Sequence, residues 1–186
     1  MRIIGGEFRG RRLAALGKGD AGAHLRPTTD RVRESLFSML LGGRFGDPIG
    51  DAVVLDLFAG TGALGLEALS RGAARVTFVD DGRVAQKLIG ANLAELGVKD
   101  RATLSRANAT RLPPLSGDPA TLVFLDPPYG LDLGGKALAS AMAQGWIAPG
   151  ALIIWEESSP QPAPEGFELL DTRRFGDTHV TFLERS

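Results

Sequence analysis

The tetrapeptide Asp126-Pro127-Pro128-Tyr129 contains the residue types best suited to chemistry in this sequence. Each proline fixes its own φ angle, and a residue before proline is pushed toward an extended conformation, so the Asp126 carboxylate and the Pro127 carbonyl hold fixed directions. Two such acceptors can face both hydrogens of a planar NH₂ group. Hydrogen bonds to those hydrogens favour a more tetrahedral nitrogen and stabilise the positive charge that develops as it attacks an electrophile. The tetrapeptide therefore predicts a site that holds an exocyclic amine for group transfer.

Tyr129, the single tyrosine, offers a flat face on which an extruded nucleobase can stack, an interaction worth roughly 1–3 kcal/mol. The preceding residues, 122–125, form an apolar run typical of a buried strand, and open α/β sheets bind ligands off the carboxyl ends of their strands. We therefore name Asp126, Pro127 and Tyr129 as candidate catalytic residues. The alternative is that the tetrapeptide is an ordinary turn that ends a strand.

A glycine-rich run follows the apolar stretch at residues 53–57 and precedes a helical pattern. Glycine admits positive φ angles and lets a ligand approach the backbone closely, while the next helix begins with unpaired N–H groups. This context predicts a nucleotide-cofactor loop, with contacts from Phe58, Ala59, Gly60 and Gly62. The spacing Gly60-x-Gly62-x-x-Gly65 also matches the dinucleotide fingerprint, so the loop alone fits both NAD and S-adenosylmethionine.

Two aspartates refine the choice of cofactor. Asp56 lies within the strand before the loop, where a dinucleotide-binding domain normally has an apolar residue. A methyltransferase uses a carboxylate there to meet the ammonium group of the methionine moiety. Asp80 ends the next apolar run, about 20 residues on, and its two oxygens suit two ribose hydroxyls. With the amine-binding tetrapeptide, these aspartates favour S-adenosylmethionine over NAD.

Apolar runs of strand type alternate with helical patterns along most of the chain, which indicates βαβ units and a parallel sheet covered on both faces. The predicted class is α/β and doubly wound. Two final runs lack an intervening helix and should pair antiparallel. We expect strands at residues 53–57, 75–79, 103–104, 122–125, 151–155, 167–174 and 178–183, and helices at 63–70, 84–96 and 136–142, with another helix starting at 28–30.

The length and composition fit one domain over residues 1–186, with residues 1–25 as a basic β-ribbon extension. No apolar run approaches the roughly 20 residues that a membrane span requires, and the N-terminus lacks the features of a secretory signal. We expect a cytoplasmic protein with no membrane partner. The absence of cysteine excludes disulfides and thiolate chemistry, and two isolated histidines make a metal site unexpected.

Charge is distributed unevenly, although the formal net charge is only -1. The first 46 residues contain nine Lys or Arg and four Asp or Glu, whereas the rest contain twelve and eighteen. A basic front end on an acidic body suggests that one face meets a polyanion such as a nucleic acid. Solvated surface cations are the alternative explanation.

With these motifs placed, the chain resembles the bacterial 16S ribosomal RNA (guanine(966)-N(2))-methyltransferases over nearly its whole length. Residues 26–34 carry the most family-specific part of the resemblance, because the glycine loop and the Pro-Pro motif occur in many other methyltransferases. The matching segments are Ile3-Ile4-Gly5-Gly6, Arg9-Gly10-Arg11, residues 25–34, residues 56–65 and the tetrapeptide.

The resemblance implies a Rossmann-like class I methyltransferase sheet that binds S-adenosyl-L-methionine, releases S-adenosyl-L-homocysteine and needs no metal. It implies methylation of a guanine N2 amine in 16S rRNA, within a small-subunit assembly particle and without an obligate protein partner. Residues 26–31, with Thr28 and Thr29, would close over the methionine end of the cofactor, and Asn108 would lie near its adenine. The candidate RNA-binding residues are Arg9, Arg11, Arg12, Arg26, Arg31 and Arg33.

The chain departs from the family pattern after Asp80, where the family tends to have another acid or amide two positions on and this chain has Gly82. Local contacts to the ribose and adenine should therefore differ. The tetrapeptide recognises an amine geometry, so the residues alone also allow adenine N6, cytosine N4 or a protein glutamine as acceptor. Two alternatives belong to other functional classes. One is an NAD-binding oxidoreductase, for which the sequence offers no evident proton donor, and the other is a non-catalytic RNA-binding module with an inactive cofactor loop.

Overall fold

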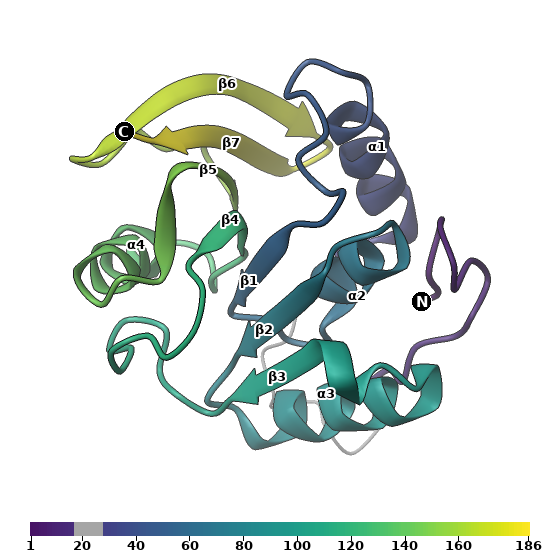
Figure 1. The fold of residues 1–186 in the computed structure, drawn as a ribbon. Coiled ribbons are helices and arrows are strands. Elements are labelled where there is room, and N and C mark those ends of the chain that lie inside the picture. The colour runs from purple at the N-terminus through teal and green to yellow at the C-terminus, as the bar shows by residue number, and fades with distance from the viewer. Residues whose placement is uncertain (17–27) are drawn as a thin grey trace.

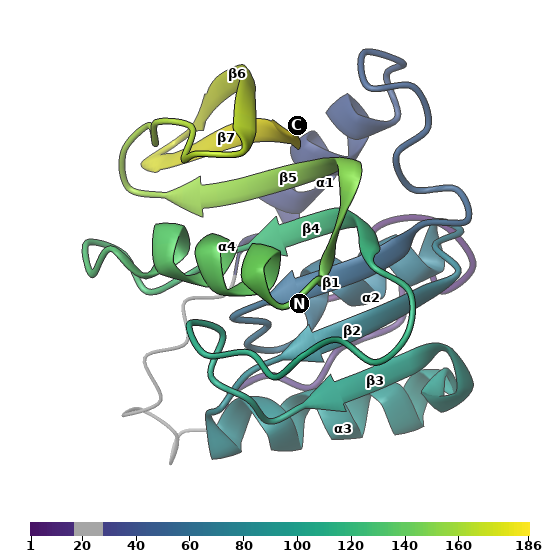
Figure 2. The same ribbon diagram turned by 60° about the vertical axis from the view of Figure 1, so that its left-hand side comes forward.

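Strands and helices alternate along residues 1–16 and 28–186, which are the residues that the computed structural model describes. Figures 1 and 2 show the strands side by side in one twisted layer with helices packed against it. In chain order the elements are α1 (Asp30–Leu40), β1 (Val53–Leu57), α2 (Ala63–Ser70), β2 (Arg75–Val79), α3 (Arg83–Leu96), a 3₁₀ helix (Lys99–Arg101), β3 (Ala102–Ser105), β4 (Ala120–Leu125), α4 (Leu133–Ala143), β5 (Ile147–Glu157), β6 (Phe167–Phe175) and β7 (Thr178–Arg185).

The sheet has the strand order β3-β2-β1-β4-β5-β7-β6. Strands β1 to β5 pair in parallel, whereas β7 lies antiparallel between β5 and β6. The direction of chain progression across the sheet changes between β1 and β4, and ligands of open α/β sheets bind beside such a point. This topology confirms the predicted doubly wound α/β fold with an antiparallel C-terminal pair.

Helices cover both faces of the sheet, as the sequence predicts. One cluster of buried residues joins a sheet face to α1, α2 and α3, and a second joins the opposite face to α4. Val54 belongs to the first cluster and Leu55 to the second, because successive side chains of a strand point to opposite faces. Asp56 therefore lies on the face covered by α1, α2 and α3.

Strand β5 begins at Ile147, before the predicted start at residue 151. Its pairing with β4 shifts register between Ala120 and Leu122, so the first part of β5 is a bulged extension. Gly150, with a φ angle of 73°, lies in this irregular part. A bulge interrupts the regular alternation of apolar residues, which is why the strand pattern in the sequence starts only after it.

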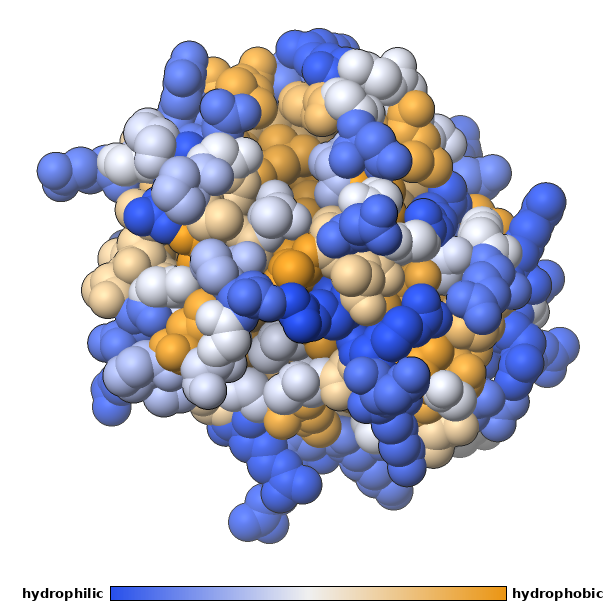
Figure 3. Space-filling view, viewed as in Figure 1, coloured by the Kyte–Doolittle hydropathy of each residue, from blue (hydrophilic) through white to orange (hydrophobic). Residues whose placement is uncertain are grey.

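The surface is mostly polar on the face seen in Figure 3, where hydrophilic side chains project around the outline and hydrophobic areas lie between them. The large hydrophobic residues that the described surface exposes are separated in the sequence: Leu41, Leu131 and Leu169. Among the described residues, no helix combines the length and apolar character needed to cross a membrane.

The predicted N-terminal ribbon is seen only in its first part, because residues 17–25 lie outside the described residues. Arg2 and Arg12 form a single isolated antiparallel bridge, and no regular strand forms within residues 1–16. In Figure 1 this segment lies beside α2. Within residues 1–16 the segment is therefore a backbone loop that contains one bridge and no regular strand.

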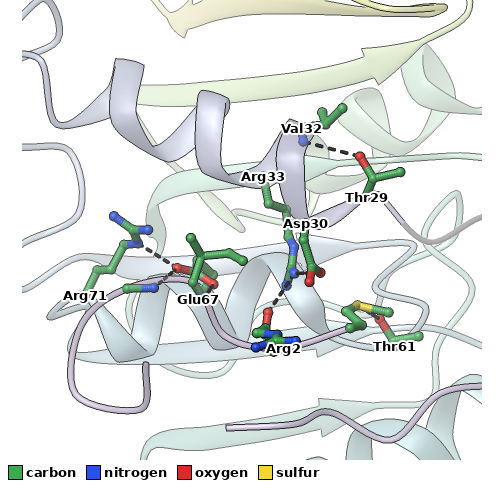
Figure 4. A network of polar contacts seen from close by, with 11 residues as sticks. Arg2, Thr29, Asp30, Val32, Arg33, Thr61, Glu67 and Arg71 are labelled. Carbon is green, nitrogen blue, oxygen red and sulfur yellow. Dashed lines mark hydrogen bonds and ion pairs between the residues drawn. The ribbon is translucent and has the colours of Figure 1, made fainter. Parts of the chain in front are cut away.

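Glu67 of α2 anchors that loop to the domain. Its two carboxylate oxygens accept from the backbone amides of Ile4 and Gly5, both at 2.9 Å. The Glu67 side chain is fully buried and also pairs with Arg71 at 2.7 Å (Figure 4). Hydrogen bonds to an ionised group are among the stronger ones in proteins, so the N-terminal loop is firmly attached to α2.

Gly65 allows α2 to pack closely against the sheet beside the glycine-rich loop. A Cβ atom at this position would lie 2.5 Å from Phe78 Cε1, 2.8 Å from Val76 Cγ1 and 2.9 Å from Asp56 Oδ2. Real Cβ atoms do not approach heavy atoms this closely, so a side chain here would push α2 away from β2.

We predict that Gly65→Ala lowers the free energy of unfolding by about 1–3 kcal/mol, because the new methyl group overpacks a filled interface. Gly90→Ala is the matched control, since Gly90 lies in α3 with open space at its Cβ position. That change should stabilise by about 0.5–1 kcal/mol through helix propensity. Urea unfolding measures both, and equal stability of the two variants would contradict the packing argument.

Candidate active site

The glycine-rich loop between β1 and α2 makes a sharp left-handed turn. Phe58, Gly60 and Gly62 have positive φ angles of 58°, 59° and 78°. This conformation is easy for glycine but costly for a bulky residue such as phenylalanine, and strain of this kind concentrates at functional sites. Gly62 is the N-cap of α2, so no side chain caps the start of that helix. Glycines in such a loop allow a ligand to approach the backbone closely.

Asp80 connects the end of β2 to the glycine-rich loop. One carboxylate oxygen accepts from the Gly60 amide and the other from the Gly82 amide, each at 2.9 Å. Burial raises the pKa of Asp80, and these two amides oppose the shift. Each carboxylate oxygen has a second lone pair, so Asp80 can still accept from hydroxyl groups of a ligand. Gly82, where the chain departs from the family pattern, contributes a backbone donor here.

Asn108 reaches the site only indirectly. Its side-chain amide donates to Asp81 Oδ2 at 2.9 Å, and its oxygen accepts from the Thr110 amide at 2.9 Å. Asp81 lines the cavity described below, whereas Asn108 is exposed and does not line it. The predicted contact of Asn108 with an adenine therefore stays a prediction.

Asp56 is a buried carboxylate in an acidic neighbourhood. Its side chain is 1% exposed, and its Oδ2 atom accepts from the Gly65 amide at 2.9 Å. Burial raises the pKa of Asp56 well above its usual range; the Gly65 bond opposes this, and the nearby charges of Asp126 and Asp80 add to it. A positive group on a ligand would favour the ionised form. Asp56 therefore fits a cofactor with an ammonium group.

The tetrapeptide Asp126-Pro127-Pro128-Tyr129 directly follows β4, at the same edge of the sheet. Pro127 is buried, while Asp126 and Tyr129 are half-buried. The Tyr129 hydroxyl lies 3.2 Å from the Thr178 hydroxyl at the start of β7, which anchors one end of the ring. The Thr28 hydroxyl lies 3.5 Å from Asp126 Oδ2. The tetrapeptide thus contacts both the segment before α1 and the last strand.

Glu156, near the end of β5, is a site residue that the sequence analysis missed. Its side chain is 2% exposed, and its Oε2 atom lies 3.4 Å from the Thr28 hydroxyl. Burial raises the pKa of Glu156 to about 7; the Thr28 bond lowers it and the charge of Asp56 raises it. The signal in the sequence was an acidic residue at the end of a long apolar run. Only the strand order reveals that this run lies next to β4.

A single cavity of about 490 Å³ brings the two predicted motifs together. Its volume lies within the roughly 300–1,000 Å³ typical of small-molecule sites. Its walls come from four parts of the chain, namely Thr28, the β1–α2 segment (Asp56 with residues 58–61 and 63–64), residues 80–85, and the tetrapeptide 126–129. Among the described residues, no group of three or more His, Asp or Glu side chains is arranged to hold a metal ion.

Thr29 does not line this cavity. It is the N-cap of α1, and its hydroxyl accepts from the Val32 amide at 3.3 Å (Figure 4). Thr28 and Thr29 therefore have different positions, although the sequence placed both at the cofactor. Only Thr28 contacts the acidic residues of the site.

The prediction that Arg33 binds RNA is wrong, because its side chain is fully buried. It donates to the Arg2 carbonyl at 2.7 Å and to Asp30 Oδ1 at 2.6 Å (Figure 4). Burial lowers the pKa of Arg33, and the charges of Glu67 and Asp30 oppose that shift. The helical period puts this residue on the inner face of α1, where it joins the helix to the N-terminal loop.

The other predicted cations have different surroundings. Arg9, Arg12 and Arg31 are exposed and stay candidates for phosphate contacts. Arg11 is also exposed, but it pairs with Glu95 at 3.0 Å. Arg26 lies outside the described residues.

The raised pKa of Glu156 predicts a dependence of stability on pH. Because the folded state holds this proton up to about pH 7 and the unfolded state releases it near 4.5, ionisation destabilises the fold as pH rises through that interval. The substitution Glu156→Gln removes this pH dependence, because a glutamine side chain does not ionise. The variant should exceed the wild type by about 1–3 kcal/mol in unfolding free energy at pH 8 and show no such gain below pH 4.5.

Urea unfolding at a series of pH values measures this difference. Glu168→Gln is the control, because Glu168 lies exposed on β6 and its substitution should change stability by less than about 0.5 kcal/mol at each pH. A constant difference between wild type and Glu156→Gln from pH 4 to pH 8 would disprove the assignment.

Comparison with known proteins gives consistent matches over the whole chain. The family model described as Conserved hypothetical protein 95 matches residues 1–184. The ribosomal RNA small subunit methyltransferase D of Escherichia coli K12 is 43% identical over 165 residues, which cover 88% of this chain and 78% of the relative. Its namesake in Haemophilus influenzae is 35% identical over 181 residues, with 95% and 89% covered.

Solved structures agree with these matches. An Escherichia coli protein assigned as a methyltransferase superimposes with a TM-score of 0.80 at 38% identity, covering 100% of this chain and 97% of the other. A Haemophilus influenzae protein assigned as a methylase gives a TM-score of 0.74 at 31% identity, covering 99% and 97%. The fold that brings the glycine-rich loop and the tetrapeptide to one edge of the sheet is thus shared with these proteins. The chain belongs to the Conserved hypothetical protein 95 family and is a methyltransferase.

Proposed function

We propose that this enzyme transfers the methyl group of S-adenosyl-L-methionine to the exocyclic N2 amine of a guanine in 16S rRNA. One observation carries the proposal: Asp126-Pro127-Pro128-Tyr129 and the glycine-rich loop line the same cavity. A loop suited to a nucleoside cofactor and a motif suited to an amine are useful together only if a group passes between them. The ribosomal RNA methyltransferase names of the relatives support the choice of substrate.

The cofactor supplies an electrophilic methyl group on a sulfonium. In the proposal, Asp56 receives the ammonium group of the methionine moiety, which offsets the electrostatic cost of this buried carboxylate. Asp80 accepts from the ribose hydroxyls, and the positive φ angles at Gly60 and Gly62 let the cofactor approach the backbone. Asp81, which accepts a hydrogen bond from Asn108 at 2.9 Å, would face the adenine.

The tetrapeptide orients the acceptor amine. Asp126 and the Pro127 carbonyl accept from the two amine hydrogens, direct the nitrogen lone pair toward the methyl group and stabilise the developing positive charge. Asp126 then accepts the proton that the methylated nitrogen loses. Tyr129, held at its hydroxyl by Thr178, stacks on the extruded base.

The exposed arginines of the front end bind the RNA backbone in this proposal. Arg9, Arg12 and Arg31 face solvent, and such cations attract phosphates without reading sequence. The acceptor guanine would be presented in a partly assembled small subunit, where the RNA fold exposes it.

We predict that Asp126→Asn lowers kcat by roughly 10²- to 10⁴-fold while the Kd for S-adenosyl-L-methionine changes only slightly. The amide keeps the size of the side chain but loses its charge and its capacity to accept a proton. Asp132→Asn is the matched control, because Asp132 is exposed, does not line the cavity, and has a φ angle of 52° that asparagine tolerates.

The measurement is mass spectrometry of nucleosides from small-subunit RNA incubated with enzyme and cofactor, combined with calorimetry for cofactor binding. N2-methylguanosine at one position is the expected product. A methyl group on adenine, cytosine or protein, or full turnover by Asp126→Asn, would refute the proposal.

A second prediction concerns the front-end cations. The double variant Arg9→Ala, Arg12→Ala should bind RNA more weakly. A plot of the logarithm of the RNA association constant against the logarithm of the salt concentration has a negative slope, and this slope should become shallower by about 0.7–0.9 for each phosphate that is no longer neutralised. Lys136→Ala, an exposed change on α4, is the control and should leave the slope unchanged. If the double variant has the wild-type slope, these two arginines do not contact phosphate.

A further inference from the structure

Two carboxylates lie next to each other at the carboxyl edge of the sheet. Leu125, the last residue of β4, is in register with Trp155 of β5, and Asp126 and Glu156 directly follow these two residues in the chain. Both approach the same hydroxyl, with Thr28 Oγ1 at 3.5 Å from Asp126 Oδ2 and 3.4 Å from Glu156 Oε2. Thr28 lines the cavity, so Glu156 lies directly behind a cavity wall.

Glu156 has unused hydrogen-bonding capacity in this position. Its Oε1 atom is buried and has no hydrogen-bond partner among residues 1–16 and 28–186. A buried acceptor without a donor destabilises a fold, and does so more strongly if it is charged. Neither cofactor binding nor the holding of the amine uses this residue. An acceptor of this kind beside the amine site indicates a ligand that brings another donor.

The nucleobases differ at the atom next to the reactive amine. In guanine, the N2 amine lies beside N1–H, so its edge presents adjacent donors to two acceptors. In adenine and cytosine, the ring nitrogen beside the amine is itself an acceptor and would face a carboxylate with mutual repulsion. A pair of neighbouring carboxylates therefore matches the guanine edge better than the edge of the other two amino-bearing bases.

We propose that Glu156 determines base specificity by accepting a hydrogen bond from N1–H of the target guanine while Asp126 holds the N2 amine. This inference rests on the proposed function and supplies the base selection that the tetrapeptide lacks. Without RNA, the Thr28 hydroxyl occupies the space between the two carboxylates. Rotation of that one side chain opens Glu156 to the base. The donor from the base then satisfies the buried carboxylate.

The test compares guanosine with 2-aminopurine riboside at the methylated position of small subunits reconstituted with 16S RNA. At pH 8, Glu156 is ionised because its pKa is about 7. 2-Aminopurine keeps the N2 amine but has an unprotonated N1, so at this pH it can meet Asp126 and not Glu156. Wild-type enzyme should methylate 2-aminopurine with a kcat/KM roughly 10- to 100-fold below that for guanosine. In Glu156→Gln, the side-chain amide can donate to N1, and this preference should shrink at least about tenfold.

Glu157→Gln is the matched control. Glu157 is the next residue of β5, points to the opposite face and already accepts from the Ser158 amide at 2.7 Å. It should keep the wild-type preference. For each enzyme, the measured quantity is the ratio of kcat/KM for guanosine to kcat/KM for 2-aminopurine. A general loss of activity or stability in a variant therefore does not affect the comparison. Glu156→Asp, which keeps the charge but withdraws it by one methylene, should turn over more slowly while still preferring guanosine.

The outcomes separate the two proposals. If wild type methylates guanosine and 2-aminopurine equally well, or if Glu156→Gln keeps the full preference, Glu156 does not read N1–H and the inference is overturned, although guanine N2 methylation stands. If wild type leaves guanosine unmethylated, the proposed function itself fails and the inference fails with it.

Discussion

Parallel pairing of β1, β4 and β5 is the constraint on which the site depends. Parallel strands place their carboxyl ends at one edge of a sheet, and their side chains alternate between its two faces. In the observed register, Asp56, Asp126 and Glu156 all lie on the face that α1, α2 and α3 cover. A slip of one residue in β4 would turn Asp126 toward α4 and separate it from the cofactor loop. The hydrophobic pattern that sets the strand register therefore also decides which carboxylates meet at the site.

The same arrangement concentrates negative charge in a partly dry site. Burial raises the pKa values of Asp56, Asp80 and Glu156, and the mutual proximity of these acids adds to the effect at Asp56 and Glu156. Such a cluster reduces the stability of the fold, so a structural role alone does not account for it. Under the proposed function, an ammonium group, ribose hydroxyls and a donor edge of guanine satisfy these carboxylates in turn. Substrate and cofactor then supply the positive charge and the hydrogen-bond donors that these carboxylates lack.

The basic N-terminal segment has a structural role in addition to its exposed charges. Arg33 is buried between α1 and the N-terminal loop, and Glu67 holds that loop on α2. Asn92, buried in α3, accepts from the Ala14 amide at 2.6 Å and donates to the Thr61 carbonyl at 3.0 Å. The segment is thereby joined to the glycine-rich loop itself. A count of cations along the sequence overestimates how many can contact RNA, because it cannot separate buried from solvated side chains.

The sequence by itself determined the features that arise from local stereochemistry and periodicity. The strand at residues 53–57, the helix at 63–70 and the strand at 75–79 have the predicted bounds, because apolar periodicity and glycine positions specify them locally. The tetrapeptide was recognisable for the same reason, since proline restricts its own backbone and that of its predecessor. Only the tertiary structure decided that Arg33 is buried, that Gly65 packs against Phe78, and that Glu156 stands beside Asp126. These facts depend on which strands adjoin and which helix faces meet, and residues far apart in the chain contain no local signal of that proximity.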